Sequence, residues 1–350
     1  MKNVQWKKVK LGDCLTIGNG CDYKHLKEGD IPVFGTGGIM AHVDGYLYDG
    51  ETVCIGRKGT INHPIYHNGK IWTVDTLFYT HSFIDVIPKF VYYAFCNIDW
   101  NKYNEATGVP SLSKETIYKI EISVPSLPAQ RRIAAILSAA DKVIEQTRQL
   151  ISKYKSIKQG MMEDLLKPKE GWKKVKLGEV GDFYVGGDVD KSCFSPYQTP
   201  ECKYPIYANA LVDEGLYGYS SKYEFDKEAV TITGRGDVGK AFYRKPYFST
   251  IIRLVTLIPR DSDIDVKFLS YAMSRINFII ESTGVPQLTA PQAKKYGVFI
   301  PYKNDKPDIV KQRRIAKILS GIDKKIEAEE KVLEKYGKMK KGLMEKLLNN

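Results

Sequence analysis

The chain has 350 residues, 43% hydrophobic and 27% charged, which is an ordinary composition for a soluble globular protein of about two or three domains. Lys and Arg together number 53 against 41 Asp and Glu, and the resulting net charge of +12 favours a polyanionic partner such as a nucleic acid. The six cysteines have neither zinc-like nor disulfide-framework spacing, and the sequence has no signal peptide and no apolar run of membrane-spanning length, so we expect a cytoplasmic protein without bound metal.

Residues 6–125 have the pattern of a mostly β domain. Short β-type segments such as Glu51–Ile55 and Ile71–Tyr79 are separated by Gly and Asp turns. The segment Phe90–Trp100 is expected to be helical. The first part of the chain therefore combines strands with a few short helices.

A long amphipathic helix is expected from about Ala129 to Leu166, after Pro128 and before Pro168. Its apolar residues recur at helical spacing, with Ile133 at heptad position a, and they form a stripe wider than a strict a/d seam. We expect this stripe to pair with another helix. Its residues are Ile133 at position a, Ile136, Val143, Leu150 and Ile157 at position d, and Leu137, Ile144 and Ile151 at position e.

The same order of elements then returns in a second copy. The motif WKKVKLGD at Trp6–Asp13 reappears as WKKVKLGE at Trp172–Glu179, an offset of 166 residues. The offset grows toward the end of the copy, so small insertions lie inside it. The other repeated motifs are TGVP, at 107–110 and 283–286, and QRRIA, at 130–134 and 312–316.

The second copy is expected to have strands at Val230–Thr233 and Ser249–Ile258, a helix at Val266–Ile280 and a second long helix. At 1.5 Å per residue each long helix would be roughly 55 Å long, and a stripe of that length cannot be covered by one small β domain. We therefore predict that the two helices pair antiparallel and hold the β domains apart, the alternative being a helical hairpin without a spacing role. The stripe residues of the second helix are Ile315, Ile318, Leu319, Ile322, Ile326, Val332 and Leu333.

The repeated motifs lie at the ends of each copy, whereas the interiors have diverged. Short matches remain between the ends, such as Ile31–Phe34 with Tyr204–Tyr207 and Ile55–Gly59 with Thr233–Gly236. This pattern favours a shared frame that carries two different reading surfaces. A duplication that simply drifted would leave a similar pattern.

Two segments, TGVPSLSK at Thr107–Lys114 and ISVPSLPAQRRIAAILS at Ile122–Ser138, resemble the specificity subunits of type I restriction-modification enzymes. The resemblance covers essentially the whole chain. It implies an α+β fold in which two mostly β target-recognition domains are separated by two long helices that pair as an antiparallel coiled coil. The implied parts are recognition domain 1 (1–128), spacer helix 1 (129–167), recognition domain 2 (168–308) and spacer helix 2 (309–350).

The resemblance also implies a function and a set of partners. Each recognition domain would bind one half of a bipartite double-stranded DNA site. The helices would set the spacing and bind two methyltransferase subunits, which restriction and translocase subunits would join. The chain itself would catalyse nothing and would need no cofactor. A type IIB system with a separate specificity subunit would look similar.

Arg, Lys, Asn and Gln side chains read base edges in the grooves of DNA, whereas contacts to phosphates only position the protein. We expect loops of the recognition domains to supply both kinds of contact. An Arg that follows a glycine can instead cap a turn or pair with an acid. The candidates are Tyr23, Lys24, His25, Arg57 and Lys58 in the first domain, and Arg235, Arg244 and Lys245 in the second.

Other chemistry has weaker support. The sequence contains no Pro-Pro dipeptide, so it lacks the Asn/Asp-Pro-Pro-aromatic motif with which a methyltransferase grips a flipped base. The segment Gly234–Ala241 fits the phosphate-binding pattern GxxxxGK, but Ala241 replaces the hydroxyl residue and Phe242 continues as a β-like segment. We interpret it, and Phe34–Gly38, as turns. The remaining alternatives are a nucleotide-dependent enzyme and a protein-interaction module.

Overall fold

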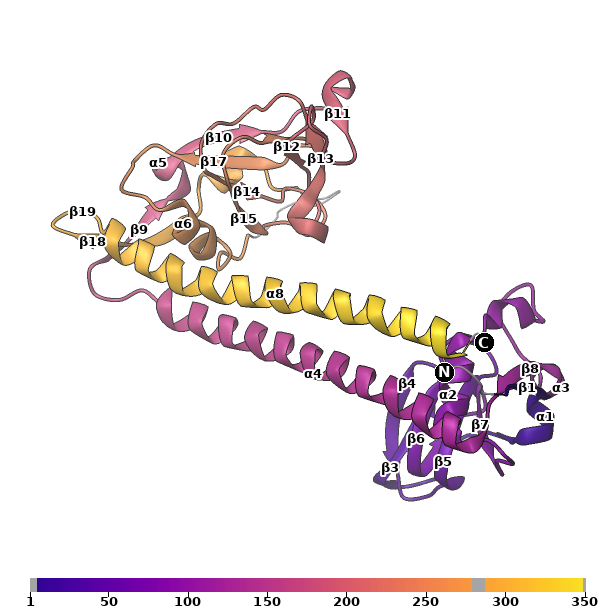
Figure 1. Cartoon of the computed structure of the whole chain (residues 1–350). Coiled ribbons are helices and arrows are strands. Elements are labelled where there is room, and N and C mark those ends of the chain that lie inside the picture. Colours follow the sequence, from indigo (N-terminus) through magenta and orange to yellow (C-terminus); the bar gives the residue numbers. More distant parts are fainter. Residues whose placement is uncertain (1–4, 279–286, 349–350) are drawn as a thin grey trace. The chain divides into compact units, whose positions relative to one another are not determined.

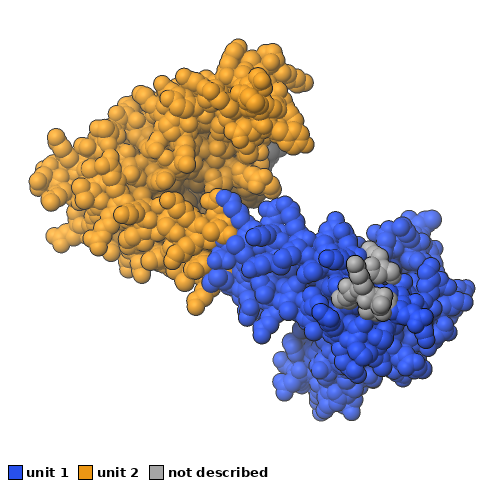
Figure 2. Space-filling model, in the orientation of Figure 1, with its two compact units in different colours: residues 1–150, 329–350 blue, residues 151–328 orange. Residues whose placement is uncertain are grey.

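The computed structural model describes residues 5–278 and 287–348. The chain forms two compact units (Figure 2): unit 1 consists of residues 1–150 and 329–350, and unit 2 of residues 151–328. Both units mix helices with sheets, so the expected α+β class is confirmed. Within the described residues, no helix is both long and apolar enough to cross a membrane.

Across its described residues, unit 1 contains a sheet of order β2-β7-β5-β6-β3-β4, in which β3 and β6 are parallel and the other neighbours antiparallel. The strands are β2 (Thr16–Asn19), β3 (Glu28–Gly35), β4 (Gly38–Val43), β5 (Tyr48–Gly56), β6 (Ile65–Thr73) and β7 (Leu77–His81). The other elements are β1 (Lys7–Lys10), β8 (Glu121–Val124), α1 (Leu11–Cys14), α2 (Pro88–Asn97), the 3-10 helix η1 (Trp100–Tyr103) and α3 (Lys114–Lys119).

The core of unit 1 includes the buried face of α2. Phe90 and Phe95 are 0% exposed and share a core with Trp100, whose indole N–H donates to the Phe95 carbonyl oxygen at 2.9 Å. Pro88 lies in the first turn of α2, where its missing N–H costs no helical hydrogen bond. The helix predicted at Phe90–Trp100 is therefore confirmed, with a 3-10 turn beginning at its last residue.

Over the described residues of unit 2, the sheets have orders β10-β17-β14-β15, β11-β13-β12-β16 and β19-β18-β9. Helix α6 contacts β14, β15 and β18. It occupies the first half of the range in which we predicted a helix, and positions 279–280 of that range lie outside the described residues. The strands are β9 (Trp172–Lys176), β10 (Gly181–Val185), β11 (Phe194–Ser195), β12 (Tyr204–Tyr207), β13 (Leu216–Ser220), β14 (Ala229–Ile232), β15 (Ala241–Arg244), β16 (Ser249–Thr250), β17 (Val255–Pro259), β18 (Gly297–Lys303) and β19 (Lys306–Pro307). The helices are α5 (Leu177–Val180), η2 (Lys191–Cys193), η3 (Val212–Gly215), α6 (Val266–Met273) and α7 (Ala290–Ala293).

The repeated ends of each copy meet in an antiparallel strand pair. In unit 1, β1 pairs with β8, and Lys7 lies opposite Val124. In unit 2, β9 pairs with β18, and Lys173 lies opposite Ile300. The repeated WKKVKLG motif therefore has a structural role, because it contains the first strand of each copy, which pairs with a strand near the end of the same copy.

Two segments that we predicted as single strands are each divided by a turn. Residues 71–79 belong to β6 and β7, and the Leu77 N–H closes the turn by donating to the Val74 carbonyl oxygen at 2.9 Å. Residues 249–258 belong to β16 and β17, and Leu254 bonds in the same way to Ile251 at 3.2 Å. Because β6 is parallel to β3 and β16 is parallel to β12, the chain changes strand partner at this turn in both units. A continuous apolar run does not record such a change, so the single-strand predictions were wrong.

The two long helices run antiparallel and side by side (Figure 1), as predicted. In unit 1, Ile133 near the start of one helix shares a core with Leu347 near the end of the other. In unit 2, Leu165 near the end of the first helix packs on a core that contains Ile315 near the start of the second. The helices are α4 (Leu127–Leu165) and α8 (Ile309–Leu348).

The buried seam between the long helices follows positions a and e of the predicted stripe, and the d positions lie beside it. Val143 and Ile157 on α4 are 36% and 41% exposed, and Val332 on α8 is 36% exposed, which corrects the expectation that these three residues pair. Because both the d and the e positions carry apolar residues, the sequence allowed either set to face the other helix. In the structure the e positions are the ones buried between the helices. Of the other expected pairing residues, Ile133, Leu137, Ile144, Ile151, Ile315, Leu319 and Ile326 are buried, and Ile136, Leu150, Ile318, Ile322 and Leu333 are half-buried.

Two buried glutamines fasten the long helices to the β domains. Gln130, 0% exposed, accepts the Ile87 N–H at 2.9 Å and donates to two backbone carbonyl oxygens. Gln312, also 0% exposed, accepts the Asp265 N–H at 3.0 Å and donates to one backbone carbonyl oxygen. The first residue of the repeated QRRIA motif is therefore a structural anchor in both copies.

Candidate nucleic-acid interface

In unit 1, a turn and a loop that are distant in the sequence pair with each other. The turn follows β5 and contains Arg57 and Lys58, and the loop follows the TGVP motif. The Leu112 N–H donates to the Arg57 carbonyl oxygen at 2.9 Å, and Lys58 forms an antiparallel bridge with Ser111. The loop therefore holds the turn that carries the two predicted cations.

The equivalent turn and loop pair in the same way in unit 2. The Leu288 N–H donates to the Gly234 carbonyl oxygen at 2.8 Å, and Arg235 forms an antiparallel bridge with Gln287. The Arg235 guanidinium also donates to Gln287 Oε1 at 3.3 Å. The second TGVP motif, at 283–286, lies outside the described residues.

These contacts show which residues of the two turns are equivalent. In both units the residue bridged to the loop is a cation, Lys58 or Arg235, and the residue before it accepts the N–H of the loop leucine. Lys58 therefore matches Arg235, and Arg57 matches Gly234. The strand registers of β5 with β6 and β14 with β15 agree with this match. Aligning Gly56 with Gly234 by sequence is one residue out of register.

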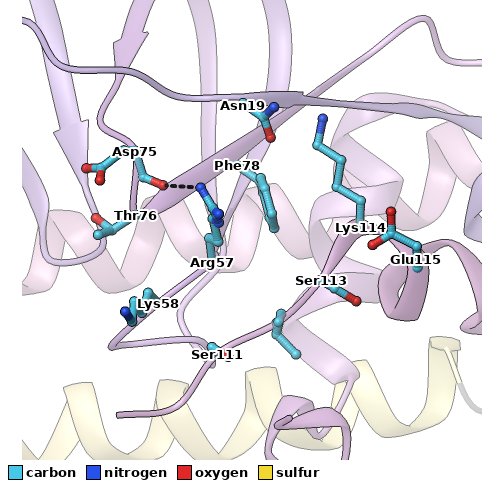
Figure 3. Close-up of a pocket in the computed structure, with 11 residues that line it drawn as sticks. Asn19, Arg57, Lys58, Asp75, Thr76, Phe78, Ser111, Ser113, Lys114 and Glu115 are labelled. Atoms are coloured by element: carbon cyan, nitrogen blue, oxygen red, sulfur yellow. Dashed lines mark hydrogen bonds between the residues drawn. The ribbon is translucent and has the colours of Figure 1, made fainter. Parts of the chain in front are cut away.

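The turn, the loop and the end of β2 line a cavity of about 510 Å³ in unit 1 (Figure 3). The Arg57 guanidinium carbon lies 5.8 Å from the centre of the Phe78 ring, and Nη1 donates to the Asp75 carbonyl oxygen at 3.4 Å. Lys114 Nζ lies 5.9 Å from the same ring centre and donates to the Ile17 carbonyl oxygen at 2.7 Å. The lining residues are Asn19, Arg57, Lys58, Asp75, Thr76, Phe78, Ser111, Leu112, Ser113, Lys114 and Glu115.

This cavity carries three cationic side chains against two carboxylates, those of Asp75 and Glu115. Within the part of the chain that the structure describes, no ion pair joins Arg57, Lys58 or Lys114 to a carboxylate. Hydroxyl groups and the Asn19 amide add further hydrogen-bonding groups. Such a set of cations and donors can bind phosphate oxygens or base edges.

Tyr23, Lys24 and His25 lie in the segment between β2 and β3 and do not line this cavity. Tyr23 is half-buried against a small core that contains Trp72, and the His25 ring meets the Trp72 ring edge-on at 5.6 Å. Lys24 is exposed. The structure therefore does not bring these three candidates together with Arg57 in one site.

Arg244 is 2% exposed, which corrects the expectation that it contacts DNA. Its guanidinium carbon lies 3.7 Å from the centre of the Tyr207 ring, and Nε donates to Thr231 Oγ1 at 2.9 Å. Its Nη1 lies 3.4 Å from Glu214 Oε2. Burial lowers the pKa of the Arg244 guanidinium and raises the pKa of the Tyr207 hydroxyl. Arg244 is thus a packed residue of unit 2, whereas its neighbour Lys245 is exposed.

The two arginine candidates of unit 2 lie at opposite ends of one strand pair. Arg244 is opposite Ala229, the first residue of β14, whereas Arg235 lies three residues beyond Ile232, the last residue of β14. The position equivalent to Arg244 in unit 1 is His67, whose ring centre lies 5.3 Å from that of Phe34. Both units therefore place a nitrogen-bearing side chain against an aromatic ring at this position.

The segment with the GxxxxGK pattern is a turn closed on Thr233. The Gly239 N–H donates to the Thr233 carbonyl oxygen at 2.8 Å, the Lys240 N–H donates to Oγ1 at 2.9 Å, and β15 follows. Phe34–Gly38 forms the hairpin between β3 and β4, with Gly38 at φ +114°, where glycine is favoured. Both turn predictions are confirmed. Among the residues described, no group of three or more His, Cys, Asp or Glu side chains is placed to hold a metal ion.

The sequence reasoning missed Asn19 and Lys114 as lining residues. Ser113 caps α3 by accepting the Thr116 N–H at 3.1 Å, so Lys114 is the first residue of that helix. Ser113 follows the TGVP motif and precedes a helical segment, so it was a usable sequence signal for this cap. Asn19 offered no such signal, because only the pairing of β2 with β7 brings it to the cavity.

Comparison with known families decides the identity of the two copies. The family model of the type I restriction modification DNA specificity domain matches the chain twice, at residues 3–155 and 169–335. The chain belongs to this family. The chain is thus a specificity subunit, and its family implies that it recognises DNA sequence.

Relatives of this specificity subunit span nearly its whole length. The putative type I specificity subunit S.MpnORF89P of Mycoplasma pneumoniae is 27% identical over 325 residues, covering 85% of this chain and 95% of the relative. S.MpnORF507P of the same organism is 25% identical over 357 residues, covering 95% and 96%. The crystal structure of the type I restriction-modification S subunit from M. genitalium shares the fold, with a TM-score of 0.78, 19% identity and coverage of 99% and 97%.

Proposed function

We propose that the chain is the sequence-reading subunit of a type I restriction-modification enzyme and that each copy reads one half of a bipartite DNA site. The observation that carries this proposal is the double match of the DNA specificity domain, once per copy. We assign the reading to target-recognition domains at 1–128 and 168–308. The spacer helices are assigned to 129–167 and 309–350.

The two domains share a frame and differ in the surfaces that they expose, which supports two different half-sites. In unit 1 the β3–β4 hairpin exposes Ile39 and Met40, which are 57% and 59% exposed. In unit 2, β12 belongs to a separate sheet with β11, β13 and β16, and Tyr217 on β13 is 46% exposed. Because base edges are read by particular side chains, such different surfaces favour an asymmetric DNA site.

The long helices would bind two methyltransferase subunits and set the spacing between the half-sites. With 39 residues, α4 is about 58 Å long. The helices also expose apolar residues beside the seam: Val143, Ile157, Val332 and Met339 are 36% to 48% exposed. Exposed apolar rows of this kind favour a protein partner. In this proposal the chain works in the cytoplasm, catalyses no step and needs no cofactor, and restriction and translocase subunits join through the complex.

Mapping of methylated bases in the source genome, before and after deletion of the gene, tests the proposal. We expect deletion to remove methylation from one motif with two defined halves and an undefined spacer. Replacing residues 1–125 with those of a relative should change one half and leave the other half and the spacer length unchanged. If no motif is lost on deletion, the chain is a protein-interaction module. If the exchange alters both halves, the one-domain, one-half assignment is wrong.

A further inference from the structure

The two recognition domains read half-sites whose bases differ, but the phosphate backbone that they contact is the same in both. Side chains that occupy equivalent positions in both units are suited to the backbone, and those that differ are suited to bases. The turns after β5 and β14 contain one position of each kind. Lys58 matches Arg235, whereas Arg57 matches Gly234.

We propose that Lys58 and Arg235 are matched DNA-phosphate contacts, one in each recognition domain, which position the DNA without reading its sequence. The proposal rests on the function proposed above. It assigns a role to residues that the family match alone does not distinguish from other surface cations.

The geometry of the backbone gives both cations the same setting. Each lies in the turn after a central strand, two residues beyond the end of β5 or three beyond the end of β14, and forms an antiparallel bridge with the loop after TGVP, at Ser111 or Gln287. In unit 1 the turn is also held from the other side, because the Lys58 N–H donates to the Thr76 carbonyl oxygen at 3.2 Å. The backbone is thus fixed in each unit, while both side chains are exposed. Because the backbone is already ordered, only the side chain loses conformational freedom when the cation binds.

The exchange of Lys for Arg between the units favours phosphate over a base edge as the ligand. Lys is a point charge with rotatable donors, whereas Arg presents a planar fork, so an exchange between them is not conservative where a bidentate contact is made. Both bind phosphate oxygens. A purely structural turn would need only the backbone bonds, and within the described residues neither side chain forms an ion pair with a carboxylate.

The test measures DNA binding by the full chain co-expressed with its methyltransferase subunits. Fluorescence anisotropy is recorded over a range of KCl concentrations with a duplex that carries the mapped motif and with a scrambled duplex. K58A and R235A should each weaken binding to both duplexes by the same factor, about three- to tenfold at moderate salt, and lower the slope of log K against log[KCl] by about 0.9 per lost phosphate contact. The double variant should lower the slope by about 1.8.

Three controls separate this outcome from others. K58R should restore the wild-type slope, because it retains the charge. K102A removes a positive charge paired with Asp99 elsewhere in unit 1, and it should leave the slope unchanged. Thermal unfolding of K58A and K58Q should match the wild type, because the side chain is exposed.

The proposal is overturned if K58A or R235A changes the methylated motif, leaves the salt slope unchanged or has no larger effect than K102A. These results differ from a failure of the proposed function. In that case the wild-type complex itself would show no preference for the motif duplex over the scrambled one.

Discussion

Asp141 on α4 and Asp323 on α8 occupy equivalent positions, and each carboxylate binds a tyrosine hydroxyl and a lysine of the other long helix. In unit 1, Asp141 accepts the Tyr93 hydroxyl at 2.8 Å and pairs with Lys340. In unit 2, Asp323 accepts the Tyr271 hydroxyl and pairs with a lysine of α4, Lys158, both at 2.5 Å. Each aspartate therefore joins a short helix, α2 or α6, to both long helices at once.

Substituting either aspartate should loosen the unit that contains it. D141N keeps the shape of the side chain but removes the charge that Lys340 and the Tyr93 hydroxyl need, so we expect a loss of about 1–3 kcal/mol in the free energy of unfolding. Burial raises the pKa of Tyr93, with Asp141 adding to the rise, so the tyrosine remains a hydrogen-bond donor at neutral pH. Urea unfolding measures the change.

The matched control for D141N is E145Q, one turn further along α4, where Glu145 lies 4.0 Å from Arg148 in an exposed i,i+3 pair. Its effect should stay within about 0.5 kcal/mol. Equal effects of D141N and E145Q would contradict a joining role for Asp141.

Replacement of the buried glutamines by alanine should be more damaging. Q130A leaves the Ile87 N–H and two carbonyl oxygens without their partner, and Q312A leaves the Asp265 N–H and one carbonyl oxygen, that of Asp263, without theirs. Because unsatisfied buried groups cost about 1–3 kcal/mol each, we expect each variant to lose at least about 2 kcal/mol of stability. Hydrogen exchange should show faster exchange of the amide that lost its acceptor. Q149A, at an exposed position of α4, should exchange like the wild type.

R244A should destabilise unit 2, and any effect on DNA binding should be a consequence of that lower stability. The substitution removes the stacking on Tyr207 and the hydrogen bond to Thr231, and it leaves a cavity in place of a buried side chain. We expect a loss of about 3–5 kcal/mol, visible as a lower melting temperature. K245A, at the exposed neighbouring position, is the control and should melt like the wild type. If R244A loses DNA binding at an unchanged melting temperature, Arg244 contacts DNA and its structural assignment is wrong.

Inserting one heptad into both long helices at matched positions should keep the seam in register and add about 10.5 Å to the pair. We expect the spacer of the methylated motif to lengthen by about three base pairs, or binding to be lost if the DNA cannot adapt to the rotation. Sequencing of methylated bases gives the answer directly. The half-site bases should not change, and new half-site bases at an unchanged spacing would refute a spacing role for the helices.

R57A should relax recognition at one half-site. Arg57 lines the cavity of unit 1 and has Gly234 at the equivalent position of unit 2, so a base contact that it makes belongs to one half of the motif. An arginine that contacts a base with both ends of its fork contributes about 1–3 kcal/mol of discrimination, roughly five- to 150-fold. Competition between motif duplexes with single base changes measures this. Equal loss against all duplexes would make Arg57 another phosphate contact.

Local patterns were enough to predict the two long helices, their antiparallel pairing and the turns at Gly234–Ala241 and Phe34–Gly38. They failed where the outcome depends on contacts between distant segments. The burial of Arg244 follows from Tyr207 and Glu214, which are far from it in sequence. The break at Val74, the seam that runs past Val143 and the equivalence of Lys58 with Arg235 are also set by non-local pairing. The equivalence of Lys58 with Arg235 becomes visible only when the strand registers of the two copies are compared.

The strand pairs that close each copy also determine how the copies follow one another. Trp6, just before β1, packs on the core that contains Leu348. Trp172, the first residue of β9, packs on the core that contains Leu166, just after α4. In both units the end of a long helix therefore shares a core with the start of a copy. In unit 2 the helix and the strand are joined directly by residues 166–171, whereas in unit 1 they belong to segments far apart in the sequence. A circular permutant opened between Leu166 and Trp172, with the present ends joined by a short linker, should therefore read the same DNA site, since neither module needs to come first.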